Sequence, residues 1–376
     1  MKILYDHQIF SFQQYGGVSR YFYELSSRVS RYPDVDVTVL ALAYLNQYLR
    51  NGLLCKLIGQ HFPYIPKTGL LRKTFNNIIS KPFIKHYKPD IIHETYYSMA
   101  DCCPHSAKRV ITVYDMIHEK FADNLSRRDN AQQIKAHAVR RADHVICISE
   151  NTRRDLIALL GVPEEKTSVV HLGYSLAMKN DAVKPAELEK PFILYIGSRG
   201  GYKNFEGLLR AYGSSRFLKN EFSMVCFGRE GFSASELSLA ESLHISQDNI
   251  LHVSGTDDIL AGLYASAAVF VCPSLYEGFG IPPLEAMSFG CPVVCANVSS
   301  LPEVVGDAAE LFDPTDEAEM RAAIERVVST PQRGQLLVDR GYERIKQFSW
   351  EKCARDTLNV YKKLLPSKSG RATVTI

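Results

Sequence analysis

The chain alternates short apolar runs with longer amphipathic stretches, and this alternation occurs twice along its length. In the first half, we predict strands at 3–5, 35–41, 91–93, 110–114 and 144–148, and helices at 18–30, 71–87, 131–141 and 150–160. In the second half, we predict strands at 192–196, 222–227, 250–253, 268–272 and 292–296, and helices at 205–212, 234–243, 258–266, 283–289 and 317–329. Near-continuous apolar strands separated by helices are typical of parallel sheets covered on both faces, so the sequence predicts an α/β fold with two doubly wound, Rossmann-like domains.

The boundary between these domains is expected in 175–191, a polar, proline-bearing stretch without periodicity that we interpret as a linker. We therefore expect one domain over 1–178 and a second over 188–348, which suits a length of 376 residues. Because ligands of doubly wound sheets bind at the carboxyl ends of the strands, two such domains facing each other predict a binding cleft.

The most specific motif is SLYEGFGIPPLEAM at 274–287, directly after an apolar run. Gly278 and Gly280 allow a tight loop with exposed amides, and the two prolines suit the first turn of a helix. A strand, a glycine loop and a helix N-terminus together direct N–H groups at an anion, most naturally a phosphate. The carboxylates of Glu277 and Glu285 suit hydroxyl groups of a ribose or a sugar. The alternative is a surface loop with a helix-capping glutamate.

The spacing of the two glutamates argues against a glycosidase. Glycosidase carboxyl groups face each other across the scissile bond at roughly 5–10 Å. If both were helical, Glu277 and Glu285 would be separated by about 12 Å of rise. With Glu277 in the loop they could lie nearer, but they would still flank a phosphate pocket.

Two further glycine loops follow predicted strands. Gly16 and Gly17 open a helix after the first strand and indicate a second phosphate-type site, although a simple turn or N-cap explains them equally well. Arg199 and Lys203 lie among glycines before another helix, where their charges would suit a departing diphosphate. The alternative for this second loop is a solvated basic surface.

Polar residues also end two strands of the first half. Asp115 and His118 follow the predicted strand at 110–114 and could contact a reacting hydroxyl, although a lone histidine is often structural. His93 and Tyr96 end the strand at 91–93 and are candidates for binding an acceptor.

Composition limits the class of protein. A net charge of +3 is too small to indicate a nucleic-acid partner, and no cluster of His, Cys or carboxylate residues has metal-ligand spacing. The scattered cysteines, the start of the chain directly in a strand and the lack of an apolar run near 18 residues predict a cytoplasmic protein.

The segment 70–88 interleaves cationic with apolar side chains, which would suit peripheral contact with the anionic inner face of the cytoplasmic membrane. The alternative is a basic amphipathic helix on the domain surface. The residues concerned are Arg72, Lys73, Lys81, Lys85, Lys88, Leu71, Phe75, Ile78, Ile79, Phe83 and Ile84.

Four stretches resemble glycosyltransferase family 4, a family of retaining enzymes with the GT-B fold. They are 16–20 (GGVSR), 197–204 (GSRGGYKN), 263–267 (LYASA) and 273–287, and the match extends over 292–294 and 300–304. The opening residues 5–22 look like those of bacterial surface-polysaccharide enzymes, which are often mannosyltransferases. The resemblance implies retaining transfer of a hexose, with mannose from GDP-mannose as the first candidate, to a saccharide or lipid-linked saccharide acceptor. It also implies that residues 349–376 cross back to complete the first domain.

The resemblance implies roles for individual residues. Glu277 would contact donor-sugar hydroxyls, with Asp115 and His118 near the reacting centre, and Glu285 would hold the ribose. The remaining donor-binding positions would be Gly16, Gly17, Arg199, Lys203, Ser254, Gly278, Phe279, Gly280 and Ile281. No cofactor or metal is expected, because the nucleotide-diphospho-sugar is a co-substrate.

Two departures from the family pattern are present. Many members have a His-Asp pair where this chain has Tyr114-Asp115, so the histidine role is open to His118. Tyr202 stands where an arginine often precedes the lysine. The sequence also leaves open other donors, such as dTDP-rhamnose or a UDP-sugar, an epimerase or phosphorylase of the same architecture, and a two-lobed sugar-binding protein.

Overall fold

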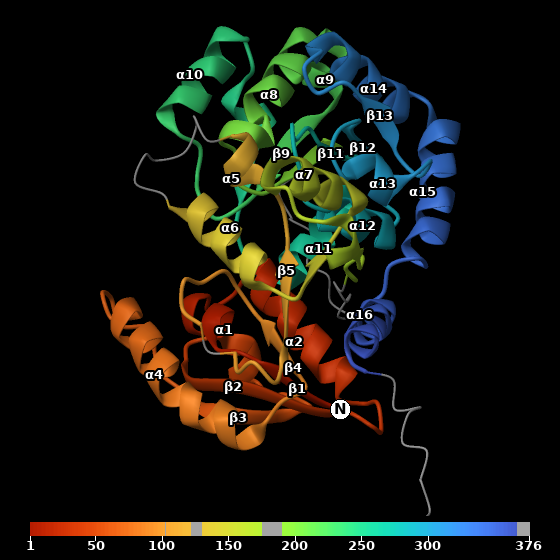
Figure 1. The fold of residues 1–376 in the computed structure, drawn as a ribbon. Coiled ribbons are helices and arrows are strands. Elements are labelled where there is room, and N and C mark those ends of the chain that lie inside the picture. Colours follow the sequence, from red (N-terminus) through yellow and green to blue (C-terminus); the bar gives the residue numbers. More distant parts are fainter. Residues whose placement is uncertain (102, 122–129, 175–189, 367–376) are drawn as a thin grey trace, which may run out of the picture.

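A computed structural model describes residues 1–101, 103–121, 130–174 and 190–366. It has two α/β lobes that lie one above the other (Figure 1). Most of the predicted linker at 175–191 lies outside the described residues. So does 367–376, the end of the predicted terminal segment.

The first domain is built on a parallel sheet in the order β3-β2-β1-β4-β5-β6-β7. Its strands are β1 (Lys2–Tyr5), β2 (Asp36–Tyr44), β3 (Lys56–His61), β4 (Ile91–Glu94), β5 (Lys108–Val113), β6 (His144–Cys147) and β7 (Thr167–Val169). Its helices are α1 (Gln8–Phe12), α2 (Gly17–Val29), α3 (Gln47–Arg50), α4 (Gly69–Tyr87), α5 (Ile117–Lys120), α6 (Ala131–Arg141) and α7 (Glu150–Leu160). The strand order reverses between β1 and β4, and such a switch point opens a crevice at the carboxyl ends of the strands.

The second domain repeats the plan, with a parallel sheet in the order β10-β9-β8-β11-β12-β13. Its strands are β8 (Phe192–Ile196), β9 (Ser223–Phe227), β10 (Ile250–Val253), β11 (Val269–Cys272), β12 (Val293–Ala296) and β13 (Glu310–Phe312). Its helices are α8 (Phe205–Ser214), α9 (Arg216–Glu221), α10 (Ala234–Ser242), α11 (Asp257–Ser266), α12 (Ile281–Ser288), α13 (Leu301–Val305), α14 (Glu317–Ser329) and α15 (Pro331–Ile345). The two doubly wound domains that the sequence predicts are therefore confirmed.

The last helix, α16 (Trp350–Leu364), belongs spatially to the first domain, where it packs against α2 (Figure 1). Ser349 is the N-cap of α16, because its hydroxyl accepts a hydrogen bond from the Lys352 amide at 3.1 Å. The chain thus crosses from the first domain to the second and back again.

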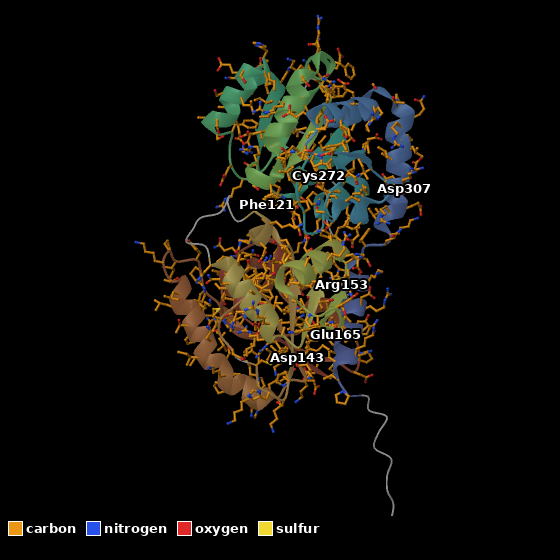
Figure 2. The ribbon with its side chains drawn as sticks, turned by 45° about the horizontal axis from the view of Figure 1, so that its top comes forward. Phe121, Asp143, Arg153, Glu165, Cys272 and Asp307 are labelled. Carbon is orange, nitrogen blue, oxygen red and sulfur yellow. The ribbon has the colours of Figure 1, made fainter. Side chains whose placement is uncertain are left out.

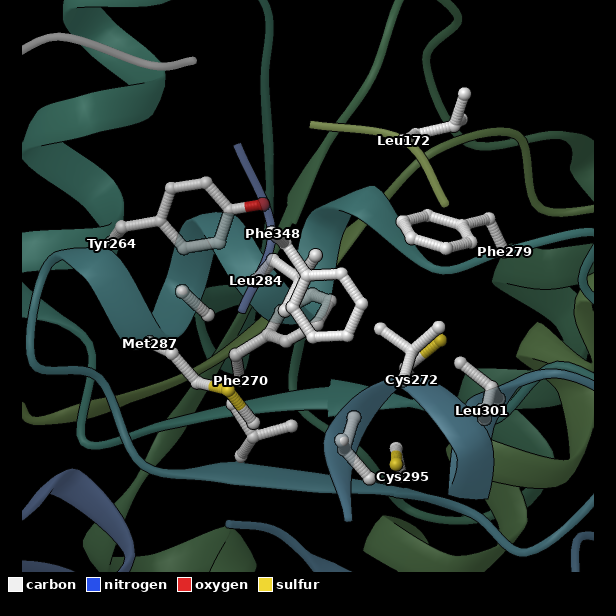
Figure 3. Packing of buried hydrophobic residues seen from close by; sticks show 14 of the residues in the cluster. Leu172, Tyr264, Phe270, Cys272, Phe279, Leu284, Met287, Cys295, Leu301 and Phe348 are labelled. Atoms are coloured by element: carbon white, nitrogen blue, oxygen red, sulfur yellow. The ribbon is translucent and has the colours of Figure 1, made fainter. Parts of the chain in front are cut away.

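The central strands of the second sheet form a continuous apolar core beneath the glycine loop. Phe270 and Cys272 of β11, Leu284 of α12 and Phe279 of the loop are buried in it (Figure 3). Because β11 has helices on both sides, every one of its residues is buried, which explains the continuous apolar run in the sequence. This packing anchors the loop between β11 and α12 from below.

Candidate active site

The loop that joins β11 to α12 is fixed by hydroxyl groups of the neighbouring loop. The Glu277 amide donates to Ser299 Oγ at 2.9 Å, and Ser300 Oγ donates to the carbonyls of Glu277 and Phe279 at 2.8 Å each. Gly280 adopts the left-handed conformation (φ 118°) directly before Ile281, the first residue of α12. Because the next two residues are prolines without an N–H, the amides that this arrangement holds at the carboxyl end of β11, where an anion is expected, are those of Gly280 and Ile281.

Gly278 brings this loop against the first domain. A Cβ at this position would lie 1.9 Å from the Tyr114 carbonyl oxygen and 3.1 Å from the Asp115 Cβ, so a side chain there would force the domains apart. The Gly278 carbonyl also accepts hydrogen bonds from Ser149 Oγ (2.8 Å) and Thr152 Oγ1 (3.3 Å) at the start of α7. The role of Gly278 in binding the donor stays a prediction, and in this structure its closest approach is to the Tyr114 carbonyl oxygen of the first domain.

Two of the predicted donor residues meet in an ion pair. Lys203 Nζ lies 2.7 Å from Glu277 Oε1, which also accepts a hydrogen bond from Ser274 Oγ at 2.6 Å. Burial opposes the charge of Lys203, but the Glu277 carboxylate outweighs it and raises the pKa of the lysine. A firmly cationic lysine beside a helix N-terminus can stabilise a phosphate.

Arg199 is engaged elsewhere. Its side chain is 6% exposed, and its guanidinium donates to Glu236 at 2.9 Å and to the Glu230 carbonyl at 2.8 Å and lies over the Phe232 ring. With its neighbours it lines a cavity of about 340 Å³ at the ends of β8 and β9. A contact between Arg199 and a diphosphate would require it to leave Glu236, as a contact of Lys203 would require that lysine to leave Glu277, so the diphosphate role of Arg199 stays a prediction. Ser254 follows β10 at the same edge of the sheet.

Glu285 in α12 is buried, and Tyr264 Oη donates to its Oε2 at 3.3 Å. Burial raises the pKa of Glu285, and the positive charge of Arg20 in α2 partly offsets this effect. Arg20 therefore acts on Glu285 from the other domain, next to Gly16 and Gly17 at the start of α2. Arg20 belongs to a motif in the sequence, but nothing in the sequence indicates that its charge acts on Glu285.

Asp115 follows β5 and is 30% exposed. Its carboxylate accepts a hydrogen bond from the Ile117 amide at 3.0 Å. His118 lies three positions further on, in α5. The structure thus brings Asp115 beside the Glu277 loop from the opposite domain and places His118 on the same connection.

His93 does not lie on the cleft surface, which corrects the prediction that it binds an acceptor. It is fully buried, with Nδ1 2.5 Å from Tyr361 Oη and Nε2 2.9 Å from Thr112 Oγ1. Burial lowers the pKa of His93 to about 3, so the ring is neutral and serves to attach α16 to the first sheet. Tyr96 is half-buried, and its ring stacks on the exposed Phe12 with 6.1 Å between centroids.

Side chains that the sequence did not single out connect the two domains. Tyr276 Oη donates to Asp155 at 2.7 Å, and Phe121 contacts the Tyr276 ring where the two lobes meet (Figure 2). Glu303 of α13 accepts hydrogen bonds from the first amides of α7, Glu150 (2.9 Å) and Asn151 (3.2 Å). These partners lie more than 100 positions apart in the chain, so no local pattern could have found them.

Within the described ranges, no group of three or more His, Cys, Asp or Glu side chains is arranged to hold a metal ion. An Asp-x-Asp triplet, a pattern that can hold a metal ion, is present at 34–36, but it ends at the first residue of β2 and so lies at the amino ends of the strands, away from the loops described above. None of the helices described is long and apolar enough to cross a bilayer.

Comparisons with known proteins agree with this geometry. Residues 15–177 match the family described as Glycosyltransferase Family 4, and residues 178–344 match Glycosyl transferases group 1. The chain is 32% identical over 301 residues to O-antigen chain mannosyltransferase B of Escherichia coli, covering 75% of this chain and 76% of that protein. It is 30% identical over 239 residues to the MMP alpha-(1->4)-mannosyltransferase of Mycolicibacterium hassiacum, covering 62% and 57% respectively.

Solved structures show the same fold. Sucrose-phosphate synthase from Thermosynechococcus elongatus has a TM-score of 0.74 at 20% identity, covering 96% of this chain and 98% of that one. Anabaena HepE in complex with UDP and glucose has a TM-score of 0.67 at 17% identity, covering 96% and 99%. With two facing Rossmann-like domains of the GT-B type and both family matches, the chain belongs to glycosyltransferase family 4 and is a glycosyltransferase.

Proposed function

We propose that the protein transfers a hexose with retention of configuration from a nucleotide-diphospho-sugar to a saccharide or lipid-linked saccharide acceptor. We further propose that it acts in surface polysaccharide synthesis at the cytoplasmic face of the membrane. The observation that carries this proposal is the Lys203–Glu277 ion pair in the loop that leads into α12, a loop that Gly278 brings against Tyr114 and Asp115 of the first domain. Mannose from GDP-mannose is our first candidate, because the relatives named above and O-antigen chain mannosyltransferase RfbU of Salmonella typhimurium are mannosyltransferases.

In this proposal the diphosphate, the sugar and the ribose of the donor would each meet a complementary group of the second domain. The diphosphate would lie at the amides of Gly280 and Ile281, where Lys203 would neutralise the charge that grows as it departs. Glu277, released from Lys203, would accept hydrogen bonds from sugar hydroxyls. Glu285 would accept hydrogen bonds from the ribose.

The transfer breaks the bond between the anomeric carbon and the phosphate oxygen and forms a bond to the acceptor oxygen. The acceptor proton would pass to the departing phosphate oxygen on the same face of the sugar, so no enzymic base is needed. Asp115 would touch the reacting hydroxyls from the opposite domain. No metal enters this scheme, since Lys203 and the helix amides stabilise the leaving group.

A panel of nucleotide sugars tests the proposal. Among the donors tested, we expect GDP-mannose to release nucleoside diphosphate fastest. We expect a glycosidic product only when a saccharide acceptor is present. A preference for dTDP-rhamnose or a UDP-sugar would change the donor and keep the reaction class. Conversion of the donor without an acceptor into an isomer would instead indicate an epimerase, and phosphate-dependent release of a sugar phosphate would indicate a phosphorylase.

We also propose that α4 holds the protein on an anionic lipid bilayer. The side of α4 that faces the domain carries Asn76, Ser80 and Ile84, whereas its solvent side interleaves large apolar side chains with lysines, which an ordinary surface helix does not. The exposed apolar side chains on α4 and the preceding loop are Phe62, Tyr64, Ile65, Leu70, Leu71, Phe75, Ile78, Ile79 and Phe83. Leu70 and Leu71 are 76% and 72% exposed, and a patch of this kind marks an interaction site.

The charge around this surface favours anionic lipid. Residues 37–89 contain no Asp or Glu, whereas they contain Arg50, Lys56, Lys67, Arg72, Lys73, Lys81, Lys85 and Lys88. We expect the protein to sediment with vesicles that contain phosphatidylglycerol and not with neutral phosphatidylcholine vesicles. Lys81→Glu/Lys85→Glu should abolish this binding, and Lys362→Glu/Lys363→Glu on exposed positions of α16 should not. Equal binding by both variants would contradict the role of α4.

A further inference from the structure

Lys135 in α6 is a buried lysine, with 2% of its side chain exposed. An ammonium group in the protein interior is costly unless it is paired and hydrogen-bonded. Its Nζ donates to Glu119 Oε2 at 2.8 Å and to the backbone carbonyl of Asp115 at 2.9 Å. It also lies 3.7 Å from Asp115 Oδ1 and 5.6 Å from the centroid of the Tyr97 ring.

The contacts of Lys135 span the connection that carries Asp115. One ammonium binds the start of this connection through both the carbonyl and the carboxylate of Asp115, and it binds the end through Glu119 in α5. The Ile117 amide holds the same Asp115 carboxylate at 3.0 Å from within the turn. The backbone and the side chain of Asp115 are therefore both fixed from beneath.

The two carboxylates around Lys135 differ in what they can do. Glu119 is buried with the lysine, so its negative charge neutralises the buried ammonium group of Lys135. Asp115 is 30% exposed and lies against the Glu277 loop at Gly278, so its carboxylate is not enclosed in the interior as that of Glu119 is. Removing Lys135 alone would leave the buried Glu119 carboxylate without its cation, so a loss of stability is expected from this pair in any case, and only the reaction rate reports on the contact with Asp115.

We infer that Lys135 is a positioning residue of the transfer reaction: it fixes the Asp115 carboxylate at the angle and depth at which it meets the reacting hydroxyls. This inference rests on the proposed function, because it requires Asp115 to contact donor or acceptor. Lys135 itself touches neither. Its loss displaces Asp115, and a displacement of about 1 Å at a reacting centre can cost 100-fold in rate.

The first test is Lys135→Met, which keeps the length of the side chain and removes its charge. We expect kcat to fall roughly 10- to 100-fold, while the affinity for the nucleoside diphosphate stays within about twofold, since that ligand binds the second domain. Lys135→Arg should recover part of the rate. Arg333→Met is the matched control: it removes a cation from the mostly buried Glu310 of the second domain, so it should lower the melting temperature without changing kcat.

A double-mutant cycle separates positioning from stability. If Lys135 acts through Asp115, the rate loss of Lys135→Met disappears in an Asp115→Asn background. Should Lys135→Met fail to fold, Lys135→Arg in the same two backgrounds gives the same comparison. A full-strength rate loss in the Asp115→Asn background, or wild-type kcat for both Lys135 variants, would overturn the inference. Failure of the proposed function would look different, because the wild-type protein would then release no nucleotide from any donor.

Discussion

Lys203 and Glu277 lie 74 positions apart in the chain and form an ion pair of 2.7 Å in the loop that leads into α12. Without a ligand, each side chain satisfies the charge of the other. We expect a bound donor to divide the pair, with the diphosphate replacing Glu277 beside Lys203 and sugar hydroxyls replacing Lys203 beside Glu277.

Glu277→Ala is expected to reduce turnover about 100-fold or more, because a contact that strengthens in the transition state is lost. Thermal unfolding measured on the same samples should change little, since the serines that fix the loop bond its backbone. Glu241→Ala on the exposed surface of α10 is the control and should leave turnover unchanged. Turnover near that of the wild type would remove Glu277 from the reaction.

Lys203→Ala is expected to weaken binding of a nucleoside diphosphate roughly 10-fold or more and to lower kcat, because a charge-assisted contact is lost. Isothermal titration calorimetry measures the binding. Lys190→Ala, which removes an exposed lysine of the same domain, should bind as the wild type does. Unchanged affinity in Lys203→Ala would mean that this lysine only pairs with Glu277.

The contact between α13 and α7 is expected to weaken in acid. Although partial burial opposes the effect, hydrogen bonds from His171 and from the Glu150 and Asn151 amides lower the pKa of Glu303. A carboxylate whose folded-state pKa is lowered stabilises the fold above its unfolded value, roughly 4.3, and loses that contribution as the pH falls through the folded value. Glu303→Gln should therefore melt below the wild type at pH 7, and the difference should shrink below about pH 4. A constant difference from pH 3 to pH 7 would contradict this assignment.

Activity is expected to survive a chelator, because the proposed leaving-group contacts come from Lys203 and from helix amides. The measurement is nucleotide release after dialysis against EDTA. Complete loss of activity that Mg²⁺ or Mn²⁺ restores would overturn the metal-free scheme.

An α-linked donor is expected to give an α-linked product, because the departing phosphate can accept the acceptor proton on the face it leaves. Proton NMR of the purified product reports the anomeric configuration. A β-linked product would require a base opposite the donor, and Asp115 would be the residue placed to serve.

Strands covered on both faces could be predicted from the sequence, whereas most edge strands could not. The apolar runs at 192–196 and 268–272 match the central strands β8 and β11, because strands covered on both faces need apolar residues at every position. The edge strand β10 was predicted at 250–253, but the edge strands β3, β7 and β13 were not predicted. The first two are only partly covered, and the last is short and includes Glu310, which pairs with two arginines.

The site was predictable where a local motif carries the geometry. Gly280 adopts the left-handed conformation before α12 that its motif implies. His93 was wrongly assigned because its partner Tyr361 lies 268 positions away, and nothing near a strand end indicates which way a ring will turn. Two other features also depend on contacts between different elements of the structure. They are the pairing of Arg199 with Glu236 and the burial of Lys135 against Glu119.

The return of the chain to the first domain limits how the cleft can open. The domains are tied once between β7 and β8 and again between α15 and α16, and α16 is hydrogen-bonded to the first sheet through Tyr361 and His93. Because α16 is anchored in the first sheet while α15 belongs to the second domain, any relative motion of the two domains must also bend the chain between these two helices. The domains therefore cannot separate without disturbing the short segment that joins α15 to α16.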